Sequence, residues 1–155
     1  GGIYNDWILT LDASFVQDNT ATGNGGGILN RRMVTVQNST VINKNMAKNG
    51  GGAYNAGIPG EPPQDRPALT VIDSAVSNNG ASAVGGGIYN DAGVVTMQAG
   101  TVINNKATVT GGGIFNTDGG AVTFDAESAV VENTPNNCVG TTTCPAAASA
   151  RHRAG

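Results

Sequence analysis

The sequence is poor in charge and in aromatic side chains. Only 12% of its 155 residues are charged and 5% are aromatic, and the formal net charge is −3. The eight basic residues are scattered, apart from the pairs around Arg31 and Arg151. Because binding to phosphate groups requires clustered Lys and Arg, we expect no nucleic-acid partner. No apolar run approaches the ~20 residues of a membrane-spanning helix, so we also expect no membrane insertion.

Cysteine is scarce too, and the two that occur stand close together, at Cys138 and Cys144 within NNCVGTTTC. A disulfide that closes this short loop would stabilise the fold by roughly 2 kcal/mol and would require an oxidising compartment. Two reduced thiols in a cytosolic protein are the alternative. Glycine-rich strings of the dinucleotide-binding kind, such as Gly23 to Gly27, are not followed by a helical pattern. We therefore expect no cofactor and no metal.

Glycine, by contrast, is abundant, with 24 residues, and much of it belongs to an internal repeat. The aligned positions Ile3, Ile28, Ala53, Ile88 and Ile114 are 25, 25, 35 and 26 residues apart. The one long interval contains the Pro- and Gly-rich segment 57–67, and without it the period is constant. The repeated motif reads GGIYN at 1–5, GGGILN at 25–30, GGGAYN at 50–55, GGGIYN at 85–90 and GGGIFN at 111–116.

Each repeat also contains an apolar–Thr–apolar triplet, which is the two-residue alternation of a β-strand. The alternation and the glycine triplets exclude an α-helical repeat. An antiparallel sandwich also has short strands, but it would not require the same residue types to return at a fixed spacing. The sequence therefore predicts an all-β fold, a right-handed single-stranded parallel β-helix (solenoid) of about five rungs of about 25 residues. We expect the β-helix at 1–137 with a loop insertion at 57–67, a disulfide-closed C-terminal cap at 138–144, and an Ala-rich flexible tail at 145–155.

Two sets of positions are predicted to face inward. The isoleucine column and a valine column should close the core, the latter formed by Val16, Val41, Val76, Val102 and Val130. Asparagines two residues after the isoleucines share their parity, and buried amides need partners, so we expect them to bond to one another as an internal ladder. The structural residues of this prediction are Asn5, Asn30, Asn55, Asn90 and Asn116, with Cys138 and Cys144. A second set, Asn19, Asn45, Asn79, Asn105 and Asn133, is assigned to turns.

Two other columns should face outward, and they supply the candidate binding residues. Stacked rings could protect the edges of the rungs or form a flat strip that holds a sugar ring or a partner protein. A threonine ladder is an ordinary outward strand feature, and it also resembles the face of ice-binding proteins. The candidates are Tyr4, Tyr54, Tyr89 and Phe115 in the first column, with Leu29 between them, and Thr10, Thr35, Thr70, Thr96 and Thr123 in the second.

With these columns in place, the sequence resembles the β-helix repeats of bacterial surface proteins. The Gly-Gly-Ile units resemble the GGA/I/L/V motif of chlamydial polymorphic outer-membrane proteins, and residues 16–19, 76–79, 102–105 and 130–133 stand where that family has FxxN. The chain is similar also to GGGIYN-repeat proteins exported by actinobacteria, which often end in NTPxNC, matched here at 133–138. The resemblance implies a β-helix fold and export, and it does not specify an activity.

Parallel β-helices also include pectate lyases and polygalacturonases, so catalysis has to be weighed. Asp6, Asp91 and Asp118 follow the asparagine column and should lie along one edge, where Asp91 and Asp118 would be neighbours. A glycosidase needs two carboxylates and a lyase needs a metal cluster with a base. The only histidine, His152, lies in the tail, and Asp after Asn is ordinary turn chemistry. We therefore expect no catalytic residues.

These observations favour a non-catalytic, secreted or cell-surface (extracellular) domain with an adhesive, scaffolding, or glycan- or protein-binding role. Its expected partners are a cell-surface glycan or protein, reached through the flat faces and the loop at 57–67. A polysaccharide lyase or hydrolase of the pectin-lyase-like type is the alternative, and an ice-binding protein that uses the threonine ladder is the second alternative. An end rung with unpaired backbone groups would also favour end-to-end or side-by-side self-association.

Overall fold

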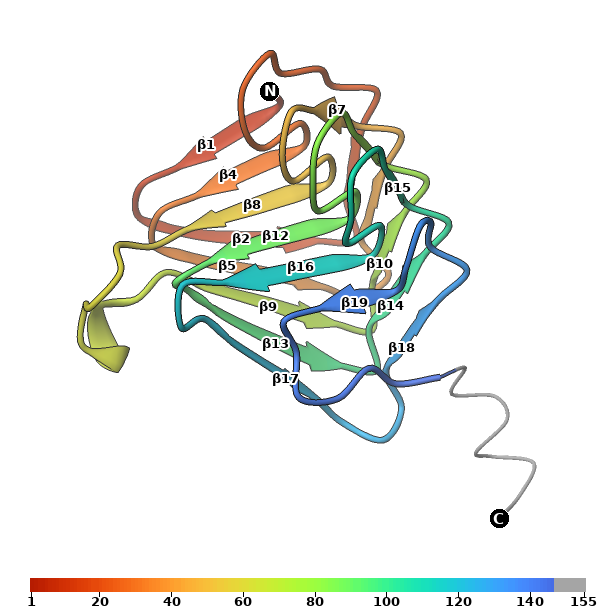
Figure 1. Cartoon of the computed structure of the whole chain (residues 1–155). Coiled ribbons are helices and arrows are strands. Elements are labelled where there is room, and N and C mark those ends of the chain that lie inside the picture. The colour runs from red at the N-terminus through yellow and green to blue at the C-terminus, as the bar shows by residue number, and fades with distance from the viewer. Residues whose placement is uncertain (147–155) are drawn as a thin grey trace.

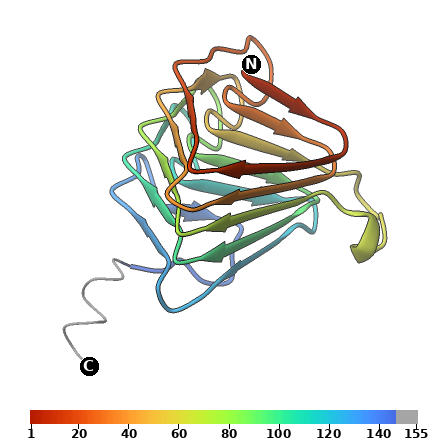
Figure 2. The same cartoon turned by 180° about the vertical axis from the view of Figure 1, so that it is seen from behind.

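The chain winds into a parallel β-solenoid, as predicted. The computed structural model describes residues 1–146, and Figure 1 shows the coils stacked from the first strand at one end to the last at the other. Each complete coil passes through one strand of each of three longer sheets, and Figure 2 shows their three-sided outline from behind. All pairs between named strands are parallel, so that each coil lies directly on the previous one.

The first strand of each coil follows the glycine motif, and these strands form the glycine sheet. Ile3 pairs with Ile28, and the register continues through every later coil. Gly85 has a left-handed backbone with φ 67°, and a Cβ atom on Gly86 would lie 2.5 Å from two backbone carbonyl oxygens. Glycine is therefore required where the coils approach each other. The sheet contains β1 (Ile3–Asn5), β4 (Ile28–Asn30), β8 (Ala53–Ala56), β12 (Ile88–Asp91), β16 (Ile114–Thr117) and β19 (Cys138–Val139).

The second strand of each coil carries the apolar–Thr–apolar triplet, and these strands form the threonine sheet. Its apolar residues alternate with the threonines, so the former turn inward and the latter outward. Leu69 and Val71 are buried, for example, while Thr70 between them is half-buried. The sheet contains β2 (Ile8–Asp12), β5 (Met33–Gln37), β9 (Ala68–Ile72), β13 (Val94–Gln98) and β17 (Ala121–Phe124).

A third sheet, the valine sheet, completes the core, and here one expectation was wrong. Val41 does not join the buried column, because it pairs with Phe15 and Ala75; its neighbour Ile42 pairs with Val16 and Val76. The second coil has one extra residue before this strand, which moves Val41 out of the core column. The sheet contains β3 (Phe15–Gln17), β6 (Val41–Asn43), β10 (Ala75–Ser77), β14 (Thr101–Ile103) and β18 (Ala129–Val131).

A short sheet of two-residue strands follows the valine sheet, and the whole encloses one apolar core. The short sheet contains β7 (Met46–Ala47), β11 (Gly80–Ala81) and β15 (Lys106–Ala107). Side chains from the three longer sheets fill the interior in continuous columns. Its largest fully buried members are Ile28, Ile42, Leu69, Ile88, Met97, Ile114, Val34, Val36, Val71, Val76, Val95 and Val102.

The predicted asparagine ladder runs through the interior at the ends of the glycine-sheet strands. Each Nδ2 donates to the Oδ1 of the next asparagine, at 2.8 Å from Asn5 to Asn30 and at 2.8 Å from Asn30 to Asn55. The series continues through Asn90 to Asn116 at 2.8 and 2.7 Å. The same Nδ2 groups also donate to backbone carbonyls at the start of the threonine sheet. The ladder thus satisfies buried amides and carbonyls together.

A second ladder is formed by the asparagines that had been assigned to turns. Asn45 donates through Nδ2 to Asn79 Oδ1 at 3.0 Å, and its backbone N–H donates to the same oxygen at 2.9 Å. Asn79 and Asn105 repeat both bonds to the following asparagine. The residue before each of these asparagines has a left-handed backbone, as at Lys44 with φ 52°. These positions are therefore both turn residues and buried ladder residues.

The C-terminal end of the solenoid is covered by the chain itself. β19 adds to the glycine sheet beside β16, and the Cys138–Cys144 disulfide, with a Cα–Cα distance of 5.9 Å, closes the loop that follows. The backbone N–H of Val130 then donates to the carbonyl of the buried Pro145 at 2.9 Å. The expected flexible tail from 147 onward and His152 lie outside the described residues.

Only one helical element occurs in residues 1–146, a 3-10 turn at Pro63–Asp65 within the loop inserted between β8 and β9. No helix in this part of the chain is long and apolar enough to cross a bilayer. Figure 1 shows the inserted loop projecting from the side of the solenoid at the middle coil. Asn55 Nδ2 donates to the carbonyl of Pro67 at 3.0 Å and so joins the two ends of the loop at its base.

Candidate binding site at the inserted loop

Each coil makes a tight turn where the glycine sheet passes into the threonine sheet, and we call these the corner turns. The asparagine ladder fixes them from inside, because Asn5 and Asn30 bond to the backbone on the far side of each turn. The inserted loop replaces the third corner turn. Its ends are held by neighbouring coils, since Gly57 N–H donates to Asp91 O and Ala68 N–H donates to Arg32 O, both at 2.7 Å. The loop therefore projects from a fixed base.

A hollow of about 300 Å³ lies between this loop and the first two corner turns. It receives side chains from the end of β1, from the corner turn before β5 and from both halves of the loop. Figures 1 and 2 show that the loop projects on the side where the corner turns lie. We name this the corner hollow, and it is lined by Tyr4, Asp6, Arg31, Arg32, Ala56, Ile58, Glu61 and Asp65.

The charged side chains of the corner hollow, all of them among residues 1–146, do not form ion pairs with one another. Within the described residues that line this hollow, neither Arg31 nor Arg32 forms an ion pair with a carboxylate, so both guanidinium groups are available to a ligand. Both arginines are exposed, as are Asp6 and Asp65. Glu61 is half-buried and its Oε2 accepts only the Ile58 N–H, at 3.4 Å. The hollow thus offers both donors and acceptors to a ligand.

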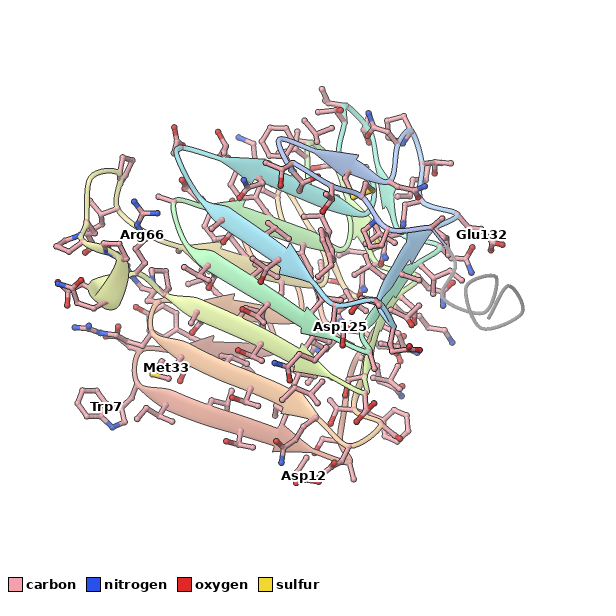
Figure 3. The ribbon with its side chains drawn as sticks, turned by 90° about the horizontal axis from the view of Figure 1, so that it is seen from below. Trp7, Asp12, Met33, Arg66, Asp125 and Glu132 are labelled. Atoms are coloured by element: carbon pink, nitrogen blue, oxygen red, sulfur yellow. A yellow bond between two sulfur atoms is a disulfide. The ribbon has the colours of Figure 1, made fainter. Side chains whose placement is uncertain are left out.

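A second, apolar hollow of about 370 Å³ adjoins the first across Arg32, which lines both. We name it the apolar hollow, and its other residues are Trp7, Ile8 and Met33. These side chains are 73%, 65% and 53% exposed. Figure 3 shows Trp7 and Met33 together at one edge of the threonine sheet, on the side where Arg66 marks the base of the loop. An exposed group of this kind is a candidate contact surface.

The predicted aromatic column faces outward, but it does not form one continuous strip. Tyr4 is 61% exposed and belongs to the corner hollow. Farther along, Tyr54, Tyr89 and Phe115 stack with centroid distances of 4.7 and 5.2 Å. Tyr54 is only 9% exposed, and Tyr89 and Phe115 are half-buried. Leu29 separates the two parts, so that Tyr4 alone presents most of its ring to solvent.

Two carboxyl groups, those of Asp91 and Asp118, lie near each other on the side of the inserted loop that faces away from the corner hollow. Tyr54 Oη donates to Asp91 Oδ2 at 2.6 Å, and the Asp118 carboxyl lies close enough to Asp91 to interact with it electrostatically. Burial raises the pKa of Asp91, and the nearby Asp118 carboxyl raises it further, although the Tyr54 hydrogen bond opposes the shift. Burial and these carboxylates also raise the pKa of Tyr89. Asp6, by contrast, lies in the first corner turn and belongs to the corner hollow.

Arg66 attaches the loop to the corner turn that contains Asp118. Arg66 donates through Nη1 to the carbonyl of Gly119, next to Asp118, at 2.9 Å, and through Nε to the carbonyl of Glu61 at 3.1 Å. The loop thus rests on the fifth corner turn and on its own backbone. This attachment holds Glu61 toward the corner hollow on the opposite side.

The two acids of this pair belong to the fourth and fifth corner turns. Asp91 ends β12, Asp118 directly follows β16, and Asp91 Oδ2 accepts the Tyr54 hydroxyl. No group of three or more His, Cys, Asp or Glu side chains that could hold a metal gathers within residues 1–146.

The threonine column lies in register on the outside of its sheet. Thr10, Thr35, Thr70, Thr96 and Thr123 pair successively from coil to coil. The positions two residues before them are apolar, but they vary in size from Ile8 and Met33 to Ala68. The face is therefore regular in its central column and irregular at its border.

Sequence reasoning named the inserted loop, which contains Glu61 and Asp65, as a contact region, but it did not name Trp7, Arg31 or Arg32 as binding residues. These three occupy turns, where no repeat pattern exists to align them. The available signal was the position of charged or aromatic residues directly after the asparagine column, at Asp6-Trp7 and Arg31-Arg32.

The fold places the chain among the parallel β-solenoid repeat proteins, and the comparison with known families adds the type of repeat. Residues 14–31 match the Chlamydia polymorphic membrane protein (Chlamydia_PMP) repeat. This segment runs from β3 through the second-ladder residue Asn19 to the glycine triplet and β4, so it contains both elements of the repeat. The chain is thus a β-helix repeat protein, and its residues 14–31 are similar to the repeat of the polymorphic membrane proteins. No curated protein and no solved structure matches it.

Proposed function

We propose that this β-solenoid is an exported, surface-exposed recognition module that binds a glycan or protein without chemically changing it. The corner hollow, with the apolar hollow beside it, is the binding site of this proposal. One observation carries it: at the place where an insertion leaves the coil, free guanidinium and carboxylate groups converge with two exposed aromatic rings, Tyr4 and Trp7. Concave sites with a few convergent polar groups are where proteins commonly bind ligands.

The location in this proposal draws support from two independent features. The matched repeat is named for a membrane protein of Chlamydia, which suggests a place at the cell surface. The Cys138–Cys144 disulfide fits an oxidising, extracellular compartment. A rigid solenoid held by ladders and a core is also a suitable support for a binding loop, because the scaffold need not move when the partner binds.

Binding by the purified protein to immobilised cell envelopes and to a printed glycan array tests the proposal. Tyr4→Ala combined with Arg32→Ala should reduce binding at least about tenfold, because the double change removes both a ring and a free cation from the hollow. Phe15→Ala is the matched control, since Phe15 is 69% exposed on the valine sheet and away from the site. Equal binding by the double variant and the control would refute the proposed site.

A further inference from the structure

We infer that the two adjoining hollows bind an uncharged oligosaccharide of at least two rings. This inference rests on the proposed function and adds the class of ligand. It follows from the balance of charges in the corner hollow, from the placement of the two exposed rings, and from the continuity of the two hollows across one side chain.

The charges of the corner hollow favour neutral hydroxyl groups over an ionic ligand. Three carboxylates, Asp6, Glu61 and Asp65, face two guanidinium groups, those of Arg31 and Arg32. A carboxylate accepts hydrogen bonds and a guanidinium only donates them. A sugar hydroxyl does both, so neighbouring hydroxyls can satisfy the two kinds of group together. A strongly anionic ligand would meet the three carboxylates and a protein of net charge −3.

Aromatic rings lie where the apolar face of a sugar would need them. Tyr4 belongs to the corner hollow and Trp7 to the apolar hollow, and both rings are largely exposed, at 61% and 73%. Rings bury a large area at low cost in conformational entropy and keep a polar edge for water or a ligand. Each hollow therefore has one ring on which a pyranose could lie.

The length of the ligand follows from Arg32, which lines both hollows. If one sugar ring binds among the carboxylates, the neighbouring space over Trp7, Ile8 and Met33 remains for a second sugar ring. A single sugar would leave one of the hollows empty. A protein partner fits less well, because stable protein interfaces bury about 800 Å² on each side, and the free surface here is concave and bordered by a loop stiffened by four prolines.

Titration calorimetry with defined sugars tests the inference. The probes are cellotriose, maltotriose, chitotriose and mannotriose, their monosaccharides, and trigalacturonate as the anionic comparison. We expect at least one neutral trisaccharide to bind more tightly than its monosaccharide, with an affinity that changes less than about twofold between 50 and 500 mM NaCl. Trp7→Ala should lower trisaccharide affinity by about fivefold to tenfold and leave monosaccharide affinity unchanged. Phe15→Ala should change neither.

Three results would overturn the inference, and they differ in what they say of the proposed function. Preference for trigalacturonate with strong salt dependence would reject the uncharged class but keep the site. Binding to cell envelopes that Tyr4→Ala/Arg32→Ala abolishes, without binding to any trisaccharide in the panel, would reject the sugar class and favour a protein partner. Binding to neither envelopes nor sugars would reject both the inference and the proposed function.

Discussion

Replacing Asn55 by alanine removes the central member of the first asparagine ladder. Asn55 is fully buried. Its Oδ1 accepts Asn30 Nδ2 at 2.8 Å, and its Nδ2 lies 2.8 Å from Asn90 Oδ1, 3.0 Å from Pro67 O and 3.1 Å from Val94 O. The two hydrogens of Nδ2 are shared among three acceptors. The substitution therefore removes about three full hydrogen bonds and leaves buried acceptors without a donor.

The expected loss in the free energy of unfolding is about 4–5 kcal/mol. Each intramolecular hydrogen bond contributes about 1 kcal/mol, which gives ~3 kcal/mol, and an acceptor left unsatisfied in the interior adds about 1–2 kcal/mol. The Asn90 Oδ1 atom is such an acceptor. This loss is a large share of the about 5–15 kcal/mol that stabilises an ordinary domain. Asn55→Asp should be at least as damaging at neutral pH, because a carboxylate there would face the Pro67 and Val94 carbonyls.

Urea unfolding followed by far-UV circular dichroism measures the loss, with the slope of the transition as a check on two-state behaviour. Asn49→Ala is the matched control. Asn49 makes one side-chain bond, to Asn24 at 2.9 Å, and it is half-buried. We expect it to cost about 1 kcal/mol or less. A loss below 1 kcal/mol for Asn55→Ala, or one no larger than that of the control, would refute the account of the ladder as a main source of stability.

Three further predictions concern the glycine triplet, the acid pair and the disulfide. Gly86→Ala should unfold or severely destabilise the protein, because its Cβ would lie 2.5 Å from backbone oxygens, whereas Gly23→Ala, with no atom within 4 Å, should leave the melting temperature nearly unchanged. Folding raises the pKa of Asp91, so the folded protein holds its proton longer than the unfolded chain does, and stability should fall as the pH rises from about 4 through the folded pKa. Asp118→Asn should flatten this decline between pH 4 and 8; an unchanged slope of melting temperature against pH would contradict the pairing. Reduction of the disulfide should lower the free energy of unfolding by about 2 kcal/mol without loss of the β signal, and a complete loss of that signal would show that the loop does more than close an end.

The fold could be predicted because the physics of stacking repeats itself in the sequence. Every coil has to bury the same aliphatic positions and to turn at the same places, so Ile28, Ile88 and Ile114 return at a constant spacing. The same argument predicted the first ladder. It failed at Val41, where one extra residue in the turn before β6 exchanged Val41 and Ile42 between surface and core. A count of residues between aligned positions is sensitive to such local insertions.

The second ladder and the binding site were harder to predict, for different reasons. Asn45 and its equivalents follow a left-handed turn residue, and a turn was a sufficient reason for an asparagine there. Only the structure shows the same side chain bonded inside. The hollows are formed by residues that occur once each, such as Trp7 and Glu61, so periodicity carries no information about them. Tyr54 shows a different limit of the sequence pattern. Its column faces outward, as expected, but its ring is nevertheless buried.

The two ladders also give the molecule a direction. In the first ladder every Nδ2 group donates toward the following coil, from Asn5 onward, and the second ladder has the same sense up to Asn133. The side-chain amide dipoles therefore point the same way along the solenoid axis and add, as peptide dipoles add along a helix. If a coil were duplicated in the same orientation, its ladder asparagines would meet an Nδ2 donor on one side and an Oδ1 acceptor on the other. In a reversed coil, Oδ1 atoms would face Oδ1 atoms. Growth of such a protein by whole coils is thus restricted to one orientation, while the outer turns stay free to lengthen.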